Sequence, residues 1–340
     1  MSASARARPC RVSRRYLPPP RTWERYAAEF QAGFRRVRTR ADAYEAMALA
    51  LTDMLAVRAP TERELQDCVR AIDTDGMPTV VSFDGHADKL RGALSVHVCR
   101  VRSLVCIQFG ANELASLPDC ISDLTALVHL DLSFNRLTTI PDSIGRLSAL
   151  QAVYLSDNQL TALPDSIGGL TALTGLRLVN NRLTALPDTI GDCTMLETLL
   201  LEGNALTTLP DSIGRLTSLT VMTASRNRLT ALPDSIGNLT ALKCLWLFRN
   251  IITALPNSIG GLTALEQMHL GDNQLTALPD SIGDLAALQN LYLNANQLTA
   301  LPDSMTSAAM PALKIVNIRG NPITEAAARA SLPPIVTIVW

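Results

Sequence analysis

The chain has 340 residues, of which 47% are hydrophobic, and its formal net charge is −1. This apolar fraction can fill a large core, but an aromatic fraction of only 4% means that the core has to be aliphatic. No apolar run reaches the roughly 18 residues that a membrane-spanning helix needs, so the sequence predicts no transmembrane segment.

Residues 1–21 are predicted to form a flexible arm rich in Arg and Pro. Residues 1–40 hold eleven Arg and two Glu, a balance of +9, which leaves −10 on the remaining 300 residues. An extended, unfolded segment is indicated by the Pro18-Pro19-Pro20 run and by the Arg residues before it, which are Arg6, Arg8, Arg11, Arg14 and Arg15. Two interpretations stay open: a solvated tail, or a segment that binds an anionic surface such as RNA, a membrane or an acidic protein.

The seven cysteines are scattered without paired spacing, and no secretory signal opens the chain. An odd number of scattered cysteines indicates thiols in a reducing compartment rather than a disulfide framework. We therefore expect an intracellular protein, in the cytoplasm in the first instance. The Arg- and Ser-rich start also resembles an organelle transit segment or a bacterial injection signal, so an organelle or delivery into a host are the alternatives.

Residues 22–103 are predicted to form a helical N-terminal cap. Apolar side chains recur at helical spacing in residues 23–37 and 44–55. Thr61 and Glu64 form a capping-box pattern that opens a third helix.

The third helix is expected to bury Val69 and Ile72 and to end before Pro78. Residues 79–83 are expected to begin a sheet as a strand. Residues 84–103 fit either a helix or an irregular first repeat.

From Leu104 onward one pattern recurs every 23 residues. Each copy reads L-x-x-L-x-L-x-x-N, followed by x-L-T-A-L-P-D-S-I-G-x-L-T-A-L with small variations. The L-x-L alternation predicts a short strand with Leu facing inward, and stacked copies can bury these Leu residues in one continuous core. The Asn is expected to satisfy backbone groups where the chain leaves the strand. It stands at positions 112, 135, 158, 181, 204, 227, 250, 273 and 296, and at 321 after a two-residue insertion.

The P-D-S-I-G segment predicts one tight or 3-10 turn in each copy. Pro presets the backbone angle, Asp or Ser is expected to cap the exposed N–H groups, and Gly permits the exit. The Asp residues then line one edge, as a row of caps or as an acidic edge that attracts a basic partner.

Self-similarity at this period, with this consensus, resembles the leucine-rich-repeat family. The 23-residue class is similar to Ras-suppressor-type scaffolds and to bacterial leucine-rich-repeat effectors. The resemblance covers residues 104–323 as ten copies. It implies an α/β solenoid, with a curved parallel β-sheet on the concave face and turns and 3-10 segments on the convex face, here behind an α-helical N-terminal cap. Residues 324–340 are expected to form a C-terminal cap, with a short helix near residues 324–330.

Motifs of catalysis are missing from the sequence. It contains no phosphate loop, no Gly-rich dinucleotide turn and no nucleophile elbow. Residues 84–88, with His97 and Cys99 nearby, are the one cluster that suggests a metal, but their spacing matches no familiar ligand set. Effector ligases of the resembling class carry a large catalytic domain after the repeats, and too few residues follow here to carry that activity over. We expect no enzyme, no cofactor and no metal site.

The residue four places before each Asn points away from the core and differs among the copies, whereas the turn residues hardly change. A position that varies in this way can carry a specific surface, and exposed aromatic and Arg residues are usual anchors of protein interfaces. We therefore predict that a protein partner docks on the concave face. The predicted contact residues are Trp246, Phe248, Arg249, Arg226, His269 and Tyr292, with a smaller group of Phe134, Tyr154 and Arg177 toward the N-terminal end.

The predicted function is a non-enzymatic scaffold for protein–protein interaction, possessing no small-molecule substrate and working alone or as a subunit of a larger assembly. Two alternatives stay open: a bacterial effector that binds a host protein, and an RNA-associated assembly subunit that uses the Arg-rich arm. RNA binding would weaken steeply with salt, whereas an aliphatic and aromatic interface would tolerate it.

Overall fold

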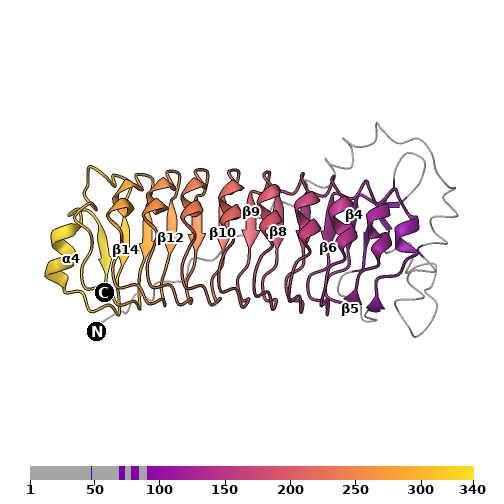
Figure 1. The fold of residues 1–340 in the computed structure, drawn as a ribbon, viewed down its shortest axis with the longest axis horizontal. Helices are drawn as coiled ribbons and strands as arrows, with labels where there is room; N and C mark the ends of the chain where they lie inside the picture. The colour runs from indigo at the N-terminus through magenta and orange to yellow at the C-terminus, as the bar shows by residue number, and fades with distance from the viewer. Residues whose placement is uncertain (1–46, 48–68, 73–77, 84–89) are drawn as a thin grey trace.

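The computed structural model describes residues 47, 69–72, 78–83 and 90–340. In this part of the chain a 13-stranded sheet runs along the molecule (Figure 1). Neighbouring strands from β2 to β15 pair in parallel, with an unshifted register from β4 through β15. The strands of the repeats are β4 (Cys106–Gln108), β6 (His129–Asp131), β7 (Ala152–Tyr154), β8 (Gly175–Arg177), β9 (Thr198–Leu200), β10 (Val221–Thr223), β11 (Cys244–Trp246), β12 (Gln267–His269), β13 (Asn290–Tyr292) and β14 (Ile315–Asn317).

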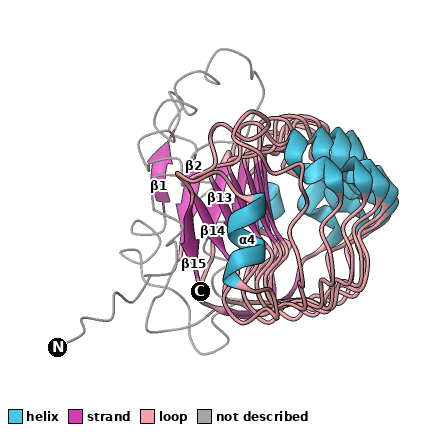
Figure 2. Cartoon of the chain, turned by 90° about the vertical axis from the view of Figure 1, so that its left-hand side faces the viewer, coloured by secondary structure: helices cyan, strands magenta, loops and turns pink. Residues whose placement is uncertain are grey.

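A row of 3-10 helices forms the wall opposite the sheet, as the end-on view in Figure 2 shows. Each follows a Pro in extended conformation, such as Pro210 with φ −69° and ψ 151°. The predicted solenoid is therefore confirmed, with one strand and one 3-10 turn in most copies. The helices are η3 (Asp119–Asp123), η4 (Asp142–Arg146), η5 (Asp165–Gly169), η6 (Asp188–Asp192), η7 (Asp211–Arg215), η8 (Asp234–Asn238), η9 (Asn257–Gly261) and η10 (Asp280–Asp284).

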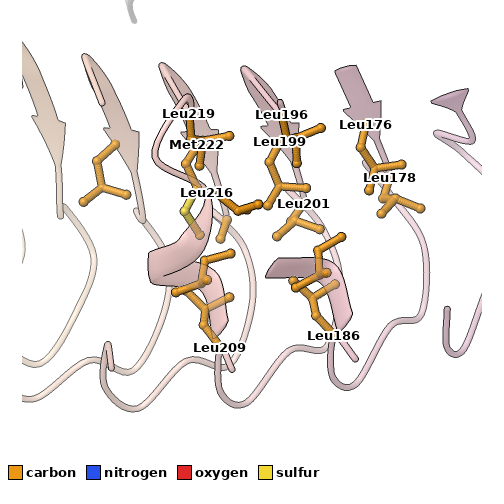
Figure 3. Close-up of a cluster of buried hydrophobic side chains, with 14 of the residues drawn as sticks. Leu176, Leu178, Leu186, Leu196, Leu199, Leu201, Leu209, Leu216, Leu219 and Met222 are labelled. Atoms are coloured by element: carbon orange, nitrogen blue, oxygen red, sulfur yellow. The ribbon is translucent and has the colours of Figure 1, made fainter. Parts of the chain in front are cut away.

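The core fills the space between these two walls and is aliphatic, as composition predicts. Inward residues such as Leu199 of β9 and Leu201 just after it are fully buried and meet side chains from the opposite side of the core, such as Leu209 (Figure 3). The same layer continues from copy to copy as one buried cluster. Each copy therefore depends on its neighbours for burial of its Leu residues.

The Asn ladder ties each copy to the one before it. The Oδ1 atom of Asn227 accepts a hydrogen bond from the backbone N–H of Leu206 at 3.0 Å. Its Nδ2 atom donates to the carbonyl oxygens of Leu201 at 2.9 Å and Ala224 at 3.1 Å. Asn227 is buried, so these bonds replace water for backbone groups at the point where the chain leaves the strand. The predicted structural role of the Asn residues is confirmed.

The predicted capping of the turns by Asp or Ser is wrong, because none of the turns from η3 to η10 has a side-chain cap hydrogen bond. Pro occupies the N-cap position of each turn from η3 to η10 and offers no side-chain acceptor, as Pro233 does in η8. The Ser hydroxyls that follow, such as that of Ser235, are buried without a hydrogen-bond partner in the described part of the chain. Ser235 instead packs against the preceding copy: a Cβ atom on Gly214 would lie 2.5 Å from its carbonyl oxygen and 2.7 Å from its Cβ atom. The Ser and Gly residues thus serve the close stacking of one turn on the next.

The N-terminal cap differs from its prediction where it is described. The expected third helix is wrong at its end, because residues 69–72 form strand β1 (Val69–Ile72), which pairs antiparallel with β2 (Pro78–Ser82). Pairing with β1 satisfies the backbone N–H and C=O groups of β2 at the edge of the sheet, whereas a helix there would leave them without backbone partners. Val and Ile also have a high propensity for strands. β2 matches the strand expected at residues 79–83 and pairs with β4.

Residues 90–103 form an irregular first repeat rather than a helix. It contains β3 (Arg91–Ala93), which pairs in parallel with β5 (Glu113–Ser116), and the 3-10 helix η2 (Val98–Arg100). Of the two upstream helices predicted, only Met47 lies within the described residues, and it is helical and buried. The arm and residues 84–88 lie outside them.

The C-terminal cap consists of helix α4 (Glu325–Ser331) and strand β15 (Thr337–Val339). Thr324 caps the helix by accepting a hydrogen bond from the N–H of Ala327 at 3.3 Å. β15 adds to β14 in parallel and lengthens the sheet beyond the last copy. No helix in the described part of the chain is long and apolar enough to cross a membrane.

Candidate protein-binding face

The outward side of the sheet, here called the sheet face, is the concave face expected from the sequence. The first and third residues of each three-residue strand point to it, while the second points into the core. Because the strands pair in register, the third residues stand side by side in a row, here called the outer row. Its members are Gln108, Asp131, Tyr154, Arg177, Leu200, Thr223, Trp246, His269, Tyr292 and Asn317.

Trp246, Phe248, His269 and Tyr292 form an aromatic cluster toward the C-terminal half of the sheet face. Trp246, His269 and Tyr292 are register partners on the neighbouring strands β11, β12 and β13. The ring of His269 lies 4.9 Å from that of Phe248 and 5.0 Å from that of Tyr292, stacked on the latter at 22°. All four side chains are half-buried, so they pack along one side and leave the other side to solvent.

His269 belongs to this cluster as a neutral ring. Burial lowers its pKa, and the nearby carboxylate of Asp272 opposes that shift only in part. A group with a pKa below its usual value of about 6.5 is uncharged at pH 7. The cluster therefore presents apolar and aromatic surface rather than a positive charge.

Arg226 and Arg249 lie at the rim of the cluster rather than within it. Both precede a ladder Asn and have positive φ values of 54° and 55°. Arg226 pairs with Glu202 at 3.5 Å, and Arg249 pairs with Asp272 at 3.9 Å, with both guanidinium groups exposed. Exposed ion pairs of this kind contribute little stability, and they neutralise the charge that the sequence offers to a partner.

The second group is more compact than the sequence suggests. The guanidinium carbon of Arg177 lies 4.1 Å from the ring centroid of Tyr154. The ring of His129 meets that of Tyr154 edge-on at 4.8 Å. We call Arg177, Tyr154 and His129 the arginine platform. Phe134 takes no part in these ring contacts and is 60% exposed.

His129 is the residue that reading the sequence missed. It is the first residue of β6, two places before the outer row, and therefore points to the same side of the sheet. Extending the alternation by two residues would have found it. Burial, and then the charge of Arg177, lower its pKa to about 4, and burial raises the pKa of Tyr154. Both rings are neutral at pH 7, which leaves Arg177 as the charge of the platform.

Comparison with family profiles decides what this repeat is. A profile described as "Leucine-rich repeat region" matches residues 79–203, 174–251 and 199–273, which together span more than half of the chain. The chain belongs to the leucine-rich-repeat family. A comparison with curated protein sequences found no match.

Solved leucine-rich-repeat structures share this architecture. The plant peptide hormone receptor RGFR1, solved in complex with RGF2, is 29% identical with a TM-score of 0.64, covering 73% of this chain and 41% of the receptor chain. The ectodomain of GASSHO1/SCHENGEN3 from Arabidopsis thaliana, in complex with CASPARIAN STRIP INTEGRITY FACTOR 2, is 25% identical with a TM-score of 0.65, covering 82% and 41%. A plant ice-binding protein, 22% identical with a TM-score of 0.65, covers 84% of this chain and 96% of its own and shows the fold alone.

These receptors are longer than the repeat chain described here, since less than half of each is covered. Binding residues of the receptors therefore do not transfer by position. Within the described residues, His, Cys, Asp and Glu do not gather in groups of three that could hold a metal ion. The role of the sheet-face residues in binding stays a prediction. In the structure these residues fall into three groups: the aromatic cluster, the rim residues Arg226 and Arg249, and the arginine platform.

Proposed function

We propose that this leucine-rich-repeat protein is a non-enzymatic interaction scaffold that binds another protein on its sheet face, mainly through the aromatic cluster. Two relatives of similar fold were solved with the ligands RGF2 and CASPARIAN STRIP INTEGRITY FACTOR 2, which supports a binding role for the family's repeats. An intracellular location is part of the proposal. It rests on the odd number and scattered spacing of the cysteines in the sequence.

One observation carries the proposal: aromatic rings gather on the side of the sheet that the core does not need. The inward Leu residues already fill the interior and are fully buried. Trp246 on β11, Phe248 just after it and Tyr292 on β13 add nothing to that layer. They nevertheless gather beside His269, which lies on the strand between them. Aromatic side chains that are clustered and open to solvent on one side are typical anchors of protein interfaces.

The test replaces Trp246 with Ala and uses linear peptides as the probe. Peptides are first selected on the wild-type protein from a phage-displayed random library and then made synthetically. We predict that Trp246→Ala weakens their binding at least about tenfold, because truncation of an anchor residue costs on the order of 2 kcal/mol. The melting temperature should stay near that of the wild type, because Trp246 lies outside the Leu core.

Trp340→Ala is the matched control, since Trp340 is exposed at the end of the chain and away from the aromatic cluster. It should leave the affinity unchanged. If Trp246→Ala binds the peptides as well as the wild type does, the aromatic cluster is not the interface. A lowered melting temperature with unchanged affinity would show that Trp246 is a local packing residue instead.

A further inference from the structure

Arg177 is an unusual residue on the sheet face because of its charge. In the repeat strands of the long sheet, β4 and β6 to β14, the outward positions contain only two side chains of the Asp, Glu, Lys and Arg types, Asp131 and Arg177. Asp131 lies two strands away, beyond Tyr154. The rim residues Arg226 and Arg249 have carboxylate partners, whereas in the described part of the chain Arg177 forms no ion pair.

The platform fixes the orientation of this charge. Stacking on Tyr154 occupies one face of the planar guanidinium group and leaves its N–H edge for another acceptor. Tyr154 is held in turn by the edge of His129, which is 2% exposed. Gly175, two residues before Arg177, adds no side chain beside the ring, and even a Cβ atom there would meet only Tyr154, at 4.0 Å. A guanidinium group that is already held loses less freedom when it binds an acceptor.

The surroundings of Arg177 decide which acceptor fits. A partner that covers the sheet face removes water from Arg177, and a desolvated charge without a counter-charge is strongly unfavourable. A carboxylate can accept two parallel hydrogen bonds from a guanidinium group. The outer row continues on both sides of Arg177, to Tyr154 and to Leu200, so a bound segment has surface to follow in both directions. This continuity favours a side chain within a segment over the end of a chain.

We propose that Arg177 is the receptor for an Asp or Glu side chain in an extended segment of the partner protein, which crosses the strands from the arginine platform to the aromatic cluster. The inference rests on the proposed function. Three strand spacings separate Arg177 on β8 from Trp246 on β11, roughly 14 Å. An extended chain covers this distance in about four residues. The recognised segment therefore has an acidic residue about four positions from a large apolar or aromatic residue.

The test is a selection with a charge swap. A phage-displayed library of random linear peptides is selected on the wild-type protein and, separately, on Arg177→Glu. The wild-type pool should be enriched in Asp or Glu at a fixed distance from an apolar residue. The Arg177→Glu pool should carry Lys or Arg at that position instead. Arg146→Glu, on the 3-10 helix η4 of the opposite wall, changes the net charge equally and should select the wild-type pattern.

Synthetic peptides then separate the two sources of a carboxylate. For a peptide from the wild-type pool, replacing the acidic residue with its amide should weaken binding to the wild type at least about tenfold, whereas amidation of the C-terminus should not. The peptide with Lys in place of the acidic residue should regain affinity for Arg177→Glu. This reciprocal rescue requires contact between the two charges and cannot come from misfolding of the variant.

Three results would overturn the inference. Equal acidic content in the peptide pools selected on the wild type and on Arg177→Glu means that Arg177 does not bind the acidic side chain of the partner. Loss of peptide binding in Trp246→Ala would still uphold the proposed function in that case. Dependence on the C-terminal carboxylate alone means that a chain end is recognised. Selection of no peptide by the wild type, or of peptides indifferent to both Arg177→Glu and Trp246→Ala, overturns the proposed function together with the inference.

Discussion

At the scale of single residues, the Asn ladder shows how one type of side chain can replace water as the hydrogen-bond partner of buried backbone groups in every repeat. Each ladder Asn bonds to backbone groups of its own copy and of the copy before it, as Asn227 does with Ala224 and Leu206. The repeated motif alone predicts this role, because an invariant amide at the end of a strand has few other uses. The role of Ser235 could not be predicted in this way. A Ser at this position suggests a hydroxyl that caps the turn, but the stacking of the copies buries that hydroxyl.

We predict that Asn227→Ala lowers the free energy of unfolding by about 1–3 kcal/mol, since it leaves the buried N–H of Leu206 without its side-chain acceptor, while the carbonyl of Leu201 keeps its hydrogen bond from Asn204. Chemical denaturation followed by circular dichroism measures this. Asn238→Ala is the matched control, because Asn238 is exposed at the end of η8 and should change stability by less than about 0.5 kcal/mol. Equal effects of the two changes would refute the structural role of the ladder.

At the scale of elements, the 3-10 turns set the spacing of the copies as much as the strands do. Gly260 in η9 approaches the next copy so closely that a Cβ atom would lie 2.7 Å from the carbonyl oxygen of Ser281 and 2.9 Å from the Oδ2 atom of Asp284. The sequence predicts a Gly here for chain exit. The structure shows instead that Gly is required by the neighbouring copy, which a reading of one copy at a time cannot reveal.

We expect Gly260→Ala to destabilise the protein by about 1–3 kcal/mol, because the added methyl group forces η9 and η10 apart. Ser281→Ala, in the facing turn, is the control: its hydroxyl is buried without a partner in the described part of the chain, so its removal should be neutral or slightly stabilising. Thermal melts of both variants give the comparison. A melting temperature of Gly260→Ala equal to that of the wild type would mean that the turns can move apart without loss of stability.

The end elements were harder to predict than the repeats. The repeats were predictable because each copy restates the same pattern, and the short helix at the C-terminus was predictable from its own residues. β1 was not, because Val69 and Ile72 fit a helical face as well as a strand. Its conformation is decided by pairing with β2, a contact that helical periodicity does not encode. On the sheet face, the rings of the aromatic cluster were predictable from alternation, whereas the pairing of Arg249 with Asp272 depends on side-chain geometry.

At the scale of the whole molecule, charge is divided unequally along the chain. The first forty residues carry +9 and the rest −10. The arm lies outside the described residues, so its role stays a proposal: contact with an anionic surface. Such a contact is electrostatic and therefore weakens as salt rises.

We predict that deletion of residues 1–20 leaves the melting temperature unchanged and lowers the salt concentration at which the protein elutes from immobilised heparin. A variant with Arg6, Arg8, Arg11, Arg14 and Arg15 all changed to Lys keeps the charge and should elute near the wild type. Elution of the deletion variant at the wild-type salt concentration would show that the arm has no electrostatic function.

The row of 3-10 helices ends before the sheet does: η10 follows β12, whereas the sheet continues with β13, β14 and β15. After η10, the ninth copy has Met305 and Thr306 where other copies have Ile and Gly, and residues 302–310 form turns without a 3-10 helix. Identical copies that stack by identical contacts could also stack on the end of another molecule, and a head-to-tail contact that does not close produces filaments. The irregular turn of the ninth copy and helix α4 do not repeat the turn surface of the other copies. The departure from the repeat thus gives this end of the described repeats a surface that differs from the one that the copies offer one another.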